Sequence, residues 1–157
     1  AMADALIGLG GNLGDVATTF DEALKRLEKS GVRILARSSN WRTPPWGVTD
    51  QPPFLNACVR AETDLSPRAL LDLCLRIEIE FGRRREAKWG PRTLDLDLLD
   101  VDGVSLDEPG LILPHPFLTE RAFVLVPLAE IAPDRIVAGR TVAEHAARIS
   151  HDGLERA

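Results

Sequence analysis

The sequence lacks several features that would place it in a specialised class of protein. Its only cysteines, Cys58 and Cys74, lie within apolar periodic segments. We therefore expect two reduced, buried thiols rather than a disulfide or a metal-binding pair. No apolar run approaches the roughly 18 residues that a membrane helix needs, and no basic stretch precedes an apolar one at the start. These absences predict a cytoplasmic protein with no signal peptide and no membrane partner.

Basic residues are also in deficit. The chain has 19 lysines and arginines against 24 acids, which gives a net charge of −5 over 157 residues. Net acidity argues against nucleic acid as a partner, because the phosphate backbone selects positive surfaces. A chain of this length can bury enough surface for one stable core. We expect a single domain over residues 1–157 that acts on small molecules and does not need to oligomerise, hence a monomer.

Common nucleotide-binding signatures are missing as well. The glycines of residues 8–14 miss the dinucleotide-binding fingerprint, because Leu13 stands where its third glycine is required. The sequence contains neither a Walker A motif nor the set of protein-kinase motifs. A nucleotide substrate would therefore have to be bound by other means.

Apolar periodicity predicts alternating strands and helices. The expected strands cover residues 5–10, 32–41, 54–63 and 93–101. The expected helices start after the N-cap residues Asp15, Ser66 and Thr141. Residues 42–53 contain four prolines and predict an irregular loop. This order indicates an α+β fold, a ferredoxin-like βαββαβ core with extra terminal elements, whose mainly antiparallel sheet has helices packed on it.

Asp95 and Asp97 are the clearest chemical feature. They lie two residues apart in a predicted strand, so their side chains project from the same face. Two ionised carboxylates this close repel each other, and a divalent cation removes that conflict. Hard oxygen ligands suit Mg²⁺, with water and phosphate in the remaining positions. The alternative is a solvated polar face on an edge strand. Two aspartates at this spacing would by themselves favour that alternative, but the residues around them favour a metal site.

That context is a basic segment just before the aspartates. Residues 83–92 carry five lysines and arginines and one acid. Guanidinium groups match phosphate oxygens in pairs, so this cluster predicts an anion site. A solvated surface loop is the alternative, but Trp89-Gly90-Pro91 would serve little purpose in one. We expect a loop hinged near Gly82 and Gly90 that closes over a polyphosphate. Glu78 is interpreted as an anchor for one of its arginines, and an ordinary surface glutamate is the alternative.

Other residues suit a flat polar ligand. Phe54 and Asn56 share one face of a predicted strand, and Phe123 offers a second aromatic ring. Two rings can sandwich a heterocycle while an amide donates and accepts at its edge. A small aromatic core cluster is the alternative that these residues alone favour. The rigid loop around Thr43-Pro44-Pro45-Trp46-Gly47 adds backbone donors and acceptors nearby.

A histidine on a stiff backbone follows the aspartates. His115 lies between Pro114 and Pro116, and taken alone it would more often be structural than catalytic. Beside a phosphate cluster it becomes a candidate donor to a phosphate oxygen. Arg121 and Phe123 would share one face if their segment is extended.

Several of these segments form a recognisable set of motifs. They are Gly10-Gly11-Asn12-Leu13-Gly14, Thr43-Pro44-Pro45, Phe54-Leu55-Asn56-Ala57, Glu78 with Gly82-Arg83-Arg84-Arg85, Trp89-Gly90-Pro91-Arg92-Thr93-Leu94-Asp95-Leu96-Asp97, and Pro114-His115 with Arg121 and Phe123. Together they closely resemble the 6-hydroxymethyl-7,8-dihydropterin pyrophosphokinase family of folate biosynthesis, over residues 5–134. The run from Trp89 to Asp97 is the most specific part.

The resemblance implies a single catalytic domain that transfers the β,γ-pyrophosphoryl group of ATP to the pterin hydroxymethyl oxygen and releases AMP. It implies that Asp95 and Asp97 hold two Mg²⁺ ions. The implied catalytic residues are Arg83, Arg92 and Asp97. The implied nucleotide-binding residues are Leu71, Glu78, Arg83, Arg85, Trp89, Arg92, Leu98, His115 and Arg121.

For the pterin, the resemblance implies a place between two aromatic rings. The implied binding residues are Thr43, Pro44, Trp46, Phe54, Asn56, Asp95 and Phe123. Phe54 stands where tyrosine is common in that family, which keeps the ring for stacking and removes one hydroxyl group.

Two other functions stay open at this point. One is another two-metal nucleotide-dependent phosphoryl or nucleotidyl transferase with a different acceptor, and the other is a ferredoxin-like module that binds single-stranded RNA. The net acidity and the paired aspartates count against RNA binding. The nucleotide product separates the two enzymes, because only transfer of a pyrophosphoryl group to the acceptor yields AMP together with a diphosphorylated pterin.

Overall fold

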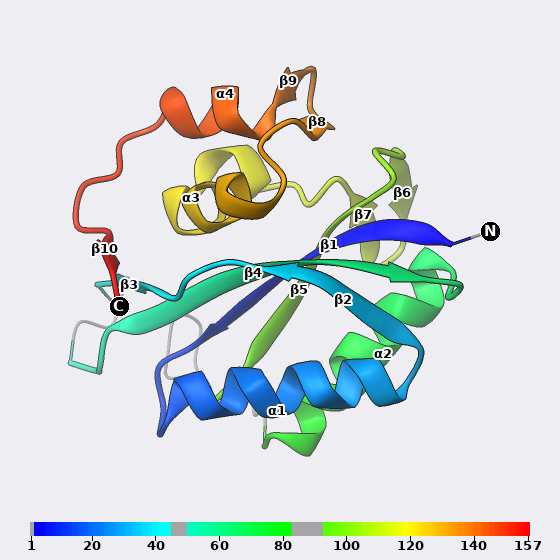
Figure 1. Ribbon diagram of the computed structural model, residues 1–157, viewed down its shortest axis with the longest axis horizontal. Coiled ribbons are helices and arrows are strands. Elements are labelled where there is room, and N and C mark those ends of the chain that lie inside the picture. Colours follow the sequence, from blue (N-terminus) through cyan, green and yellow to red (C-terminus); the bar gives the residue numbers. More distant parts are fainter. Residues whose placement is uncertain (1, 45–49, 83–92) are drawn as a thin grey trace.

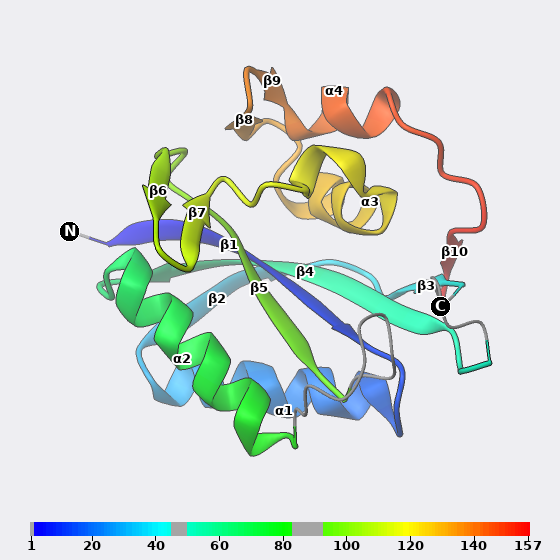
Figure 2. The same cartoon turned by 180° about the vertical axis from the view of Figure 1, so that it is seen from behind.

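The chain forms an antiparallel sheet with helices on both faces (Figures 1 and 2). The structure, a computed structural model, describes residues 2–44, 50–82 and 93–157. The strands of the main sheet are β1 (Ala3–Gly11), β2 (Val32–Arg37), β3 (Trp41–Thr43), β4 (Phe54–Thr63), β5 (Asp95–Val101) and β10 (Glu155–Arg156). Their order is β10-β3-β4-β1-β5, and β2 pairs with β4 beyond the end of β3. β1 and β4 are therefore central, and β5 lies at one edge.

Helices lie on both sides of this sheet, and on one side they form two layers (Figure 1). Helices α1 (Val16–Lys29) and α2 (Pro67–Glu80) lie on one side. On the other, α3 (Ala122–Ile131) lies against the sheet, with α4 (Val142–Ala147) packed outside α3. The succession β1-α1-β2-β4-α2-β5 confirms the predicted ferredoxin-like core. The smaller elements are the hairpin β6 (Leu106–Glu108) and β7 (Leu111–Leu113), the 3-10 helix η1 (Leu118–Glu120), and the hairpin β8 (Ile136–Val137) and β9 (Arg140–Thr141).

The helix starts follow the capping residues expected from the sequence. The Asp15 carboxylate accepts a hydrogen bond from Thr18 N at 3.2 Å, and Ser66 Oγ accepts one from Ala69 N at 3.2 Å. Thr141 forms a reciprocal capping box with Glu144. Each cap satisfies backbone N–H groups that the helix itself leaves unpaired.

Alternation along the central strands produces two apolar clusters. In β1, Ala5, Ile7 and Leu9 pack under α1 and α2, whereas Leu6 faces the opposite side. Leu6 joins Cys58, Leu99 and the apolar residues of α3 in the second cluster. Both cysteines are buried and free, as predicted. Burial, with a contribution from the charges of Glu78 and Asp97, raises the pKa of the Cys74 thiol to about 12, so it is protonated at neutral pH.

The predicted strand over residues 32–41 is wrong as a single element. The structure has two strands there, β2 and β3, with an interruption at residues 38–40. Ser38 N donates to Cys58 O at 2.9 Å, and Ser38 Oγ accepts from Cys58 N at 2.8 Å. This side-chain bond replaces one link of the backbone ladder, so the pairing with β4 continues in a second short strand. β3 then extends to Thr43, into the segment predicted as an irregular loop.

The segment that carries Arg121 and Phe123 is not extended, so the condition under which the two would share a strand face is not met. Phe123 lies in the first turn of α3, and Arg121 is its N-cap residue. Nearly every position of this helix is apolar, because it is covered by the sheet on one side and by α4 on the other. No polar stripe therefore marks it as a helix in the sequence, and Pro127 argues against one.

β5 begins at Asp95 rather than at Thr93. Within the described ranges, no helix has the length and apolar character needed to cross a membrane.

Candidate active site

Two glycines of β1 form the centre of the site. Gly10 pairs with Asn56 of β4 on one side and with Asp95 of β5 on the other. Gly8 pairs in the same way with Cys58 and Asp97. Directly paired residues project from the same face of a sheet. Asn56–Gly10–Asp95 and Cys58–Gly8–Asp97 thus form two rows across the sheet. They place an amide and two carboxylates on the α3 face, and the glycines of β1 between them carry no side chain.

The paired aspartates lie where the sequence predicts. Asp95 and Asp97 are partly buried on edge strand β5, whereas Leu96 between them is buried in the opposite cluster. The described residues contain no group of three or more His, Cys, Asp or Glu side chains that could hold a metal ion. A donor set of two carboxylates nevertheless fits Mg²⁺, which commonly binds one or two protein carboxylates and takes its other ligands from water and phosphate.

The predicted pterin residues on β3 and β4 come together on the same face. Asn56 is 8% exposed, and its Nδ2 donates to Thr43 Oγ1 at 3.1 Å. Thr43 pairs with Phe54 in the register of the two strands, so all three side chains share this face. The bond to Thr43 fixes the orientation of the amide, which leaves Asn56 a pre-aligned carbonyl and one further N–H for a ligand edge.

Asn12 supports the same region, a role that sequence reasoning did not assign beyond its place in a motif. It is buried, and its Nδ2 donates to Gln51 Oε1 and to Pro52 O, both at 2.9 Å. These bonds tie the turn after β1 to the residues that lead into β4. The sequence signal for this role was an asparagine within the glycine-rich turn, two residues after Gly10. Its burial, and hence its need for partners from elsewhere in the fold, is seen only in the structure.

Glu78 makes a contact with the edge strand that the sequence did not predict. Its side chain is 1% exposed, and Oε2 accepts a hydrogen bond from Leu96 N at 2.7 Å. Leu96 lies between the two aspartates, so this carboxylate from α2 holds the backbone of the edge strand at the point from which both project. The expected contact of Glu78 with an arginine involves residues 83–92, which lie outside the described residues.

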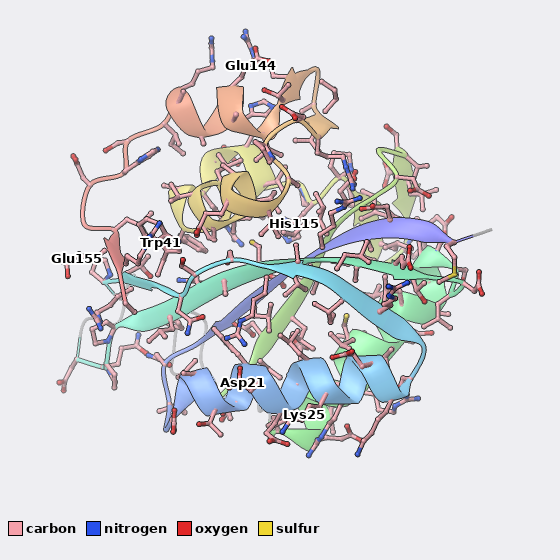
Figure 3. The ribbon with its side chains drawn as sticks, viewed as in Figure 1. Asp21, Lys25, Trp41, His115, Glu144 and Glu155 are labelled. Carbon is pink, nitrogen blue, oxygen red and sulfur yellow. The ribbon has the colours of Figure 1, made fainter. Side chains whose placement is uncertain are left out.

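His115 lies beside β5 between the sheet and α3 (Figure 3). Its backbone N donates to Leu99 O at 2.8 Å, two residues after Asp97. Its Nδ1 accepts from Phe117 N at 3.2 Å. An accepting Nδ1 carries no proton, so the neutral ring has its proton on Nε2, which is the donor available to a ligand. Burial, and then the charge of Arg121, lower the pKa of His115 below its ordinary value of 6.5.

This lowered pKa predicts a pH-dependent stability. Because the unfolded chain binds the proton more readily, the folded state loses stability as the pH falls from the ordinary pKa through the lower folded pKa. His115→Asn should remove this loss, because asparagine does not titrate. The Oδ1 atom of the new asparagine can accept the hydrogen bond from Phe117 N that His115 Nδ1 accepts in the wild type. The melting temperature of the wild type should therefore fall more than that of the variant between about pH 7.5 and 5.5. Parallel curves for the two proteins would contradict the assignment.

Arg121 and Phe123 do meet, although not through an extended segment. The Arg121 guanidinium carbon lies 5.0 Å from the centre of the Phe117 ring and 5.6 Å from that of Phe123. The arginine is thereby held between two aromatic rings, which restricts its side chain without neutralising its charge. Phe123 itself packs against the second apolar cluster on the α3 face.

Of the remaining predicted site residues, the structure describes Leu71, Leu98 and Pro44. Leu71 is partly buried on α2, and Leu98 is 5% exposed, with both side chains in or against the cluster under α1 and α2. A nucleotide could therefore contact Leu98 mainly through its backbone. Pro44 is exposed just after β3. The others lie outside the described residues: Trp46, Arg83, Arg85, Trp89 and Arg92.

The fold and this face define a class of protein, namely α+β proteins with a ferredoxin-like core that present a buried amide and a pair of carboxylates on one face of the sheet. Comparison with known proteins makes the assignment specific. Residues 6–133 match the family model of 7,8-dihydro-6-hydroxymethylpterin-pyrophosphokinase (HPPK). The chain belongs to this family.

Its relatives agree with that match. A 2-amino-4-hydroxy-6-hydroxymethyldihydropteridine pyrophosphokinase of Methylorubrum extorquens is 51% identical over 156 residues, which is 99% of both chains. The enzyme of the same name from Pseudomonas aeruginosa is 42% identical over 152 residues, 96% of this chain and 94% of that one. A Plasmodium falciparum HPPK-DHPS structure is similar with a TM-score of 0.75 at 13% identity, over 99% of this chain and 48% of that one. The chain thus spans less than half of that solved structure. At 13% identity, this similarity shows the fold alone.

The family prediction made from the motifs is therefore confirmed. The chain is a pyrophosphokinase that transfers the pyrophosphoryl group of ATP to 6-hydroxymethyl-7,8-dihydropterin in folate biosynthesis.

Proposed function

We propose that the α3 face of the sheet carries this reaction, with the pterin over Gly10 and the triphosphate of ATP beside β5. The observation that supports the proposal is the pair of rows Asn56–Gly10–Asp95 and Cys58–Gly8–Asp97. One row ends in an amide for a heterocycle, and both end in carboxylates on β5. The two substrates would therefore meet between these strands.

In this proposal Asp95 and Asp97 hold Mg²⁺, with two ions as the expected number. When bound, Mg²⁺ neutralises charge on the triphosphate and aligns its oxygens. The His115 Nε2–H and the Arg121 guanidinium face the phosphates as donors. Arg83, Arg85, Trp89 and Arg92 would close over the nucleotide, with Arg83 and Arg92 stabilising the charge that develops during transfer. Leu71, Glu78 and Leu98 would border the nucleotide from α2 and β5.

The pterin would lie between the rings of Phe54 and Phe123. Asn56 hydrogen-bonds to its polar edge, together with backbone groups of Thr43, Pro44 and Trp46. Asp95 lies across Gly10 from Asn56, on the side where the hydroxymethyl group would point. Asp97 provides a route for the hydroxyl proton as the oxygen attacks the β-phosphorus of ATP, and AMP leaves.

The test is product analysis with the metal controlled. Incubation with ATP and 6-hydroxymethyl-7,8-dihydropterin should yield AMP in an amount equal to the diphosphorylated pterin, and only when Mg²⁺ is present. Removal of Mg²⁺ with a chelator should stop the reaction, and its return should restore it. Formation of ADP, or turnover that is indifferent to the chelator, would contradict the proposal. A monomeric, cytoplasmic state and a single catalytic domain over residues 1–157 stay predictions.

A further inference from the structure

Glu130 links the two elements that carry opposite walls of the proposed pterin site. It lies on α3, seven residues after Phe123, so the two side chains project from the same side of that helix. Its Oε1 accepts from Trp41 Nε1 at 2.7 Å and from Ser39 N at 3.3 Å. Its Oε2 accepts from Ser39 Oγ at 2.9 Å. One carboxylate thus joins α3 to the start of β3.

Trp41 in turn shares a face with the pterin residues. It pairs with Asn56 in the register of β3 and β4, and Thr43 lies two residues further along the same strand. Residues two apart in a strand project from the same face. A shift of Trp41 would therefore displace Thr43, whose hydroxyl accepts the hydrogen bond that orients Asn56.

The end of the described chain completes this contact from the outside. β10 pairs with β3, with Arg156 opposite Trp41 and Glu155 opposite Arg42. Figure 3 shows Trp41 and Glu155 together at this end of the sheet. The Arg156 guanidinium carbon lies 5.2 Å from the Trp41 ring centre, and Arg156 Nη2 lies 3.7 Å from Glu130 Oε2.

The same segment also reaches the loop after β3. Gly153 lies next to Pro44, and an added Cβ would be in van der Waals contact with the Pro44 Cδ and Cγ atoms, at 3.5 Å. Ala157 N donates to Asn40 O at 2.9 Å. Residues 153–157 therefore contact the chain from Asn40 to Pro44, the segment that contains β3. Residues 153–157 lie beyond the part of the chain that matches the family model.

We propose that Glu130 is a positioning residue for the pterin, and that residues 153–157 act with it. It sets the distance between α3, which carries Phe123, and β3, whose Thr43 is paired with Phe54 on β4, and hence the width of the slot between the two aromatic rings. The proposal rests on the function proposed above. Trp41, Arg156 and Glu130 touch neither ATP nor the metal ligands in this arrangement, so their effect should be confined to the pterin.

Steady-state kinetics with each substrate varied in turn tests this role. Glu130→Ala should raise KM for the pterin by roughly tenfold, because misplaced binding groups lose much of their effect. KM for ATP, and kcat at saturating pterin, should stay within about twofold of wild type. Trp41→Phe, which removes the Nε1 donor with the pyrrole part of the indole and keeps one aromatic ring, should change KM for the pterin in the same direction. Glu130→Gln keeps an acceptor for Trp41 and should restore most of the affinity.

A matched control separates positioning from stability. Glu144→Ala removes the capping box of α4, so it should lower the melting temperature and leave KM for the pterin unchanged. If Glu130→Ala and Trp41→Phe lower the melting temperature with an unchanged KM for the pterin, Glu130 is merely structural and the proposal is wrong. If Glu130→Ala does not fold, the Trp41→Phe result decides alone. Failure of the wild type to form AMP with the pterin would instead overturn the proposed function.

Discussion

Replacement of Asp97 by asparagine should lower kcat by about a thousandfold or more, because metal-dependent phosphoryl transfer depends on charge neutralisation at this position. Asparagine keeps the size of the side chain and one oxygen, but it loses the negative charge that attracts a divalent cation. Asp97 also lies opposite Gly8 in the register of β1 and β5, where its backbone pairing is independent of its side chain. The variant should therefore fold normally while losing turnover.

Titration with Mg²⁺ and product analysis measure this effect. Raising Mg²⁺ well above the wild-type requirement should recover part of the activity if the lost charge acts through metal affinity. Asp107→Asn is a matched control, since Asp107 is an exposed acid on β6, away from the two rows. It should leave kcat unchanged. Near-normal turnover of Asp97→Asn at ordinary Mg²⁺ would refute the metal assignment for this aspartate.

Local signals predicted most of the core that carries the site. The caps Asp15, Ser66 and Thr141, together with the alternation in β4, place these elements close to their observed bounds. Each of these features is decided by residues near in sequence, because capping and alternation depend on neighbours. The facing of Asp95 and Asp97 followed from the same rule.

Features that depend on distant residues were not predictable in this way. Strand 32–41 is broken because Ser38 bonds to Cys58 and Ser39 bonds to Glu130 on another element. Helix α3 is apolar on most sides because it is covered from both, so no stripe marks it. Glu78 could be placed near the aspartates, but its bond to Leu96 N required the packing of α2 against the edge of β5.

The position of Gly10 shows how a residue without a side chain contributes to the site. An added Cβ at Gly10 would lie 3.1 Å from Asn56 Oδ1 and 4.0 Å from the Asp95 Cβ. The added methyl group would therefore occupy the space between the Asn56 amide, which is proposed to bind the pterin, and the Asp95 side chain on β5. Gly10 does not have a positive φ, so alanine can adopt its backbone conformation. A substitution at Gly10 therefore tests whether the space above this residue is needed for pterin binding, and it does not strain the backbone of the strand.

Gly10→Ala should accordingly raise KM for the pterin by about tenfold to a hundredfold, because displacing the Asn56 amide by a fraction of an ångström misaligns its hydrogen bonds. KM for ATP should change much less, since the added methyl group lies on the Asn56 side of the row. Initial rates with each substrate varied in turn measure the two effects separately. Isothermal titration with the pterin alone would show the same loss of affinity without turnover.

Gly8→Ala is the matched control for this prediction. Gly8 lies on the same face of the same strand, but the three atoms nearest to its added Cβ all belong to the Leu99 side chain, at 3.5 Å or more, which is an ordinary contact. The methyl group would also stand next to Cys58 rather than Asn56. Its effect on KM for the pterin should be within about threefold, because no hydrogen-bonding group has to move. Equal effects of the two substitutions would mean that the pterin does not lie over Gly10, and its place would then have to be sought elsewhere on the sheet.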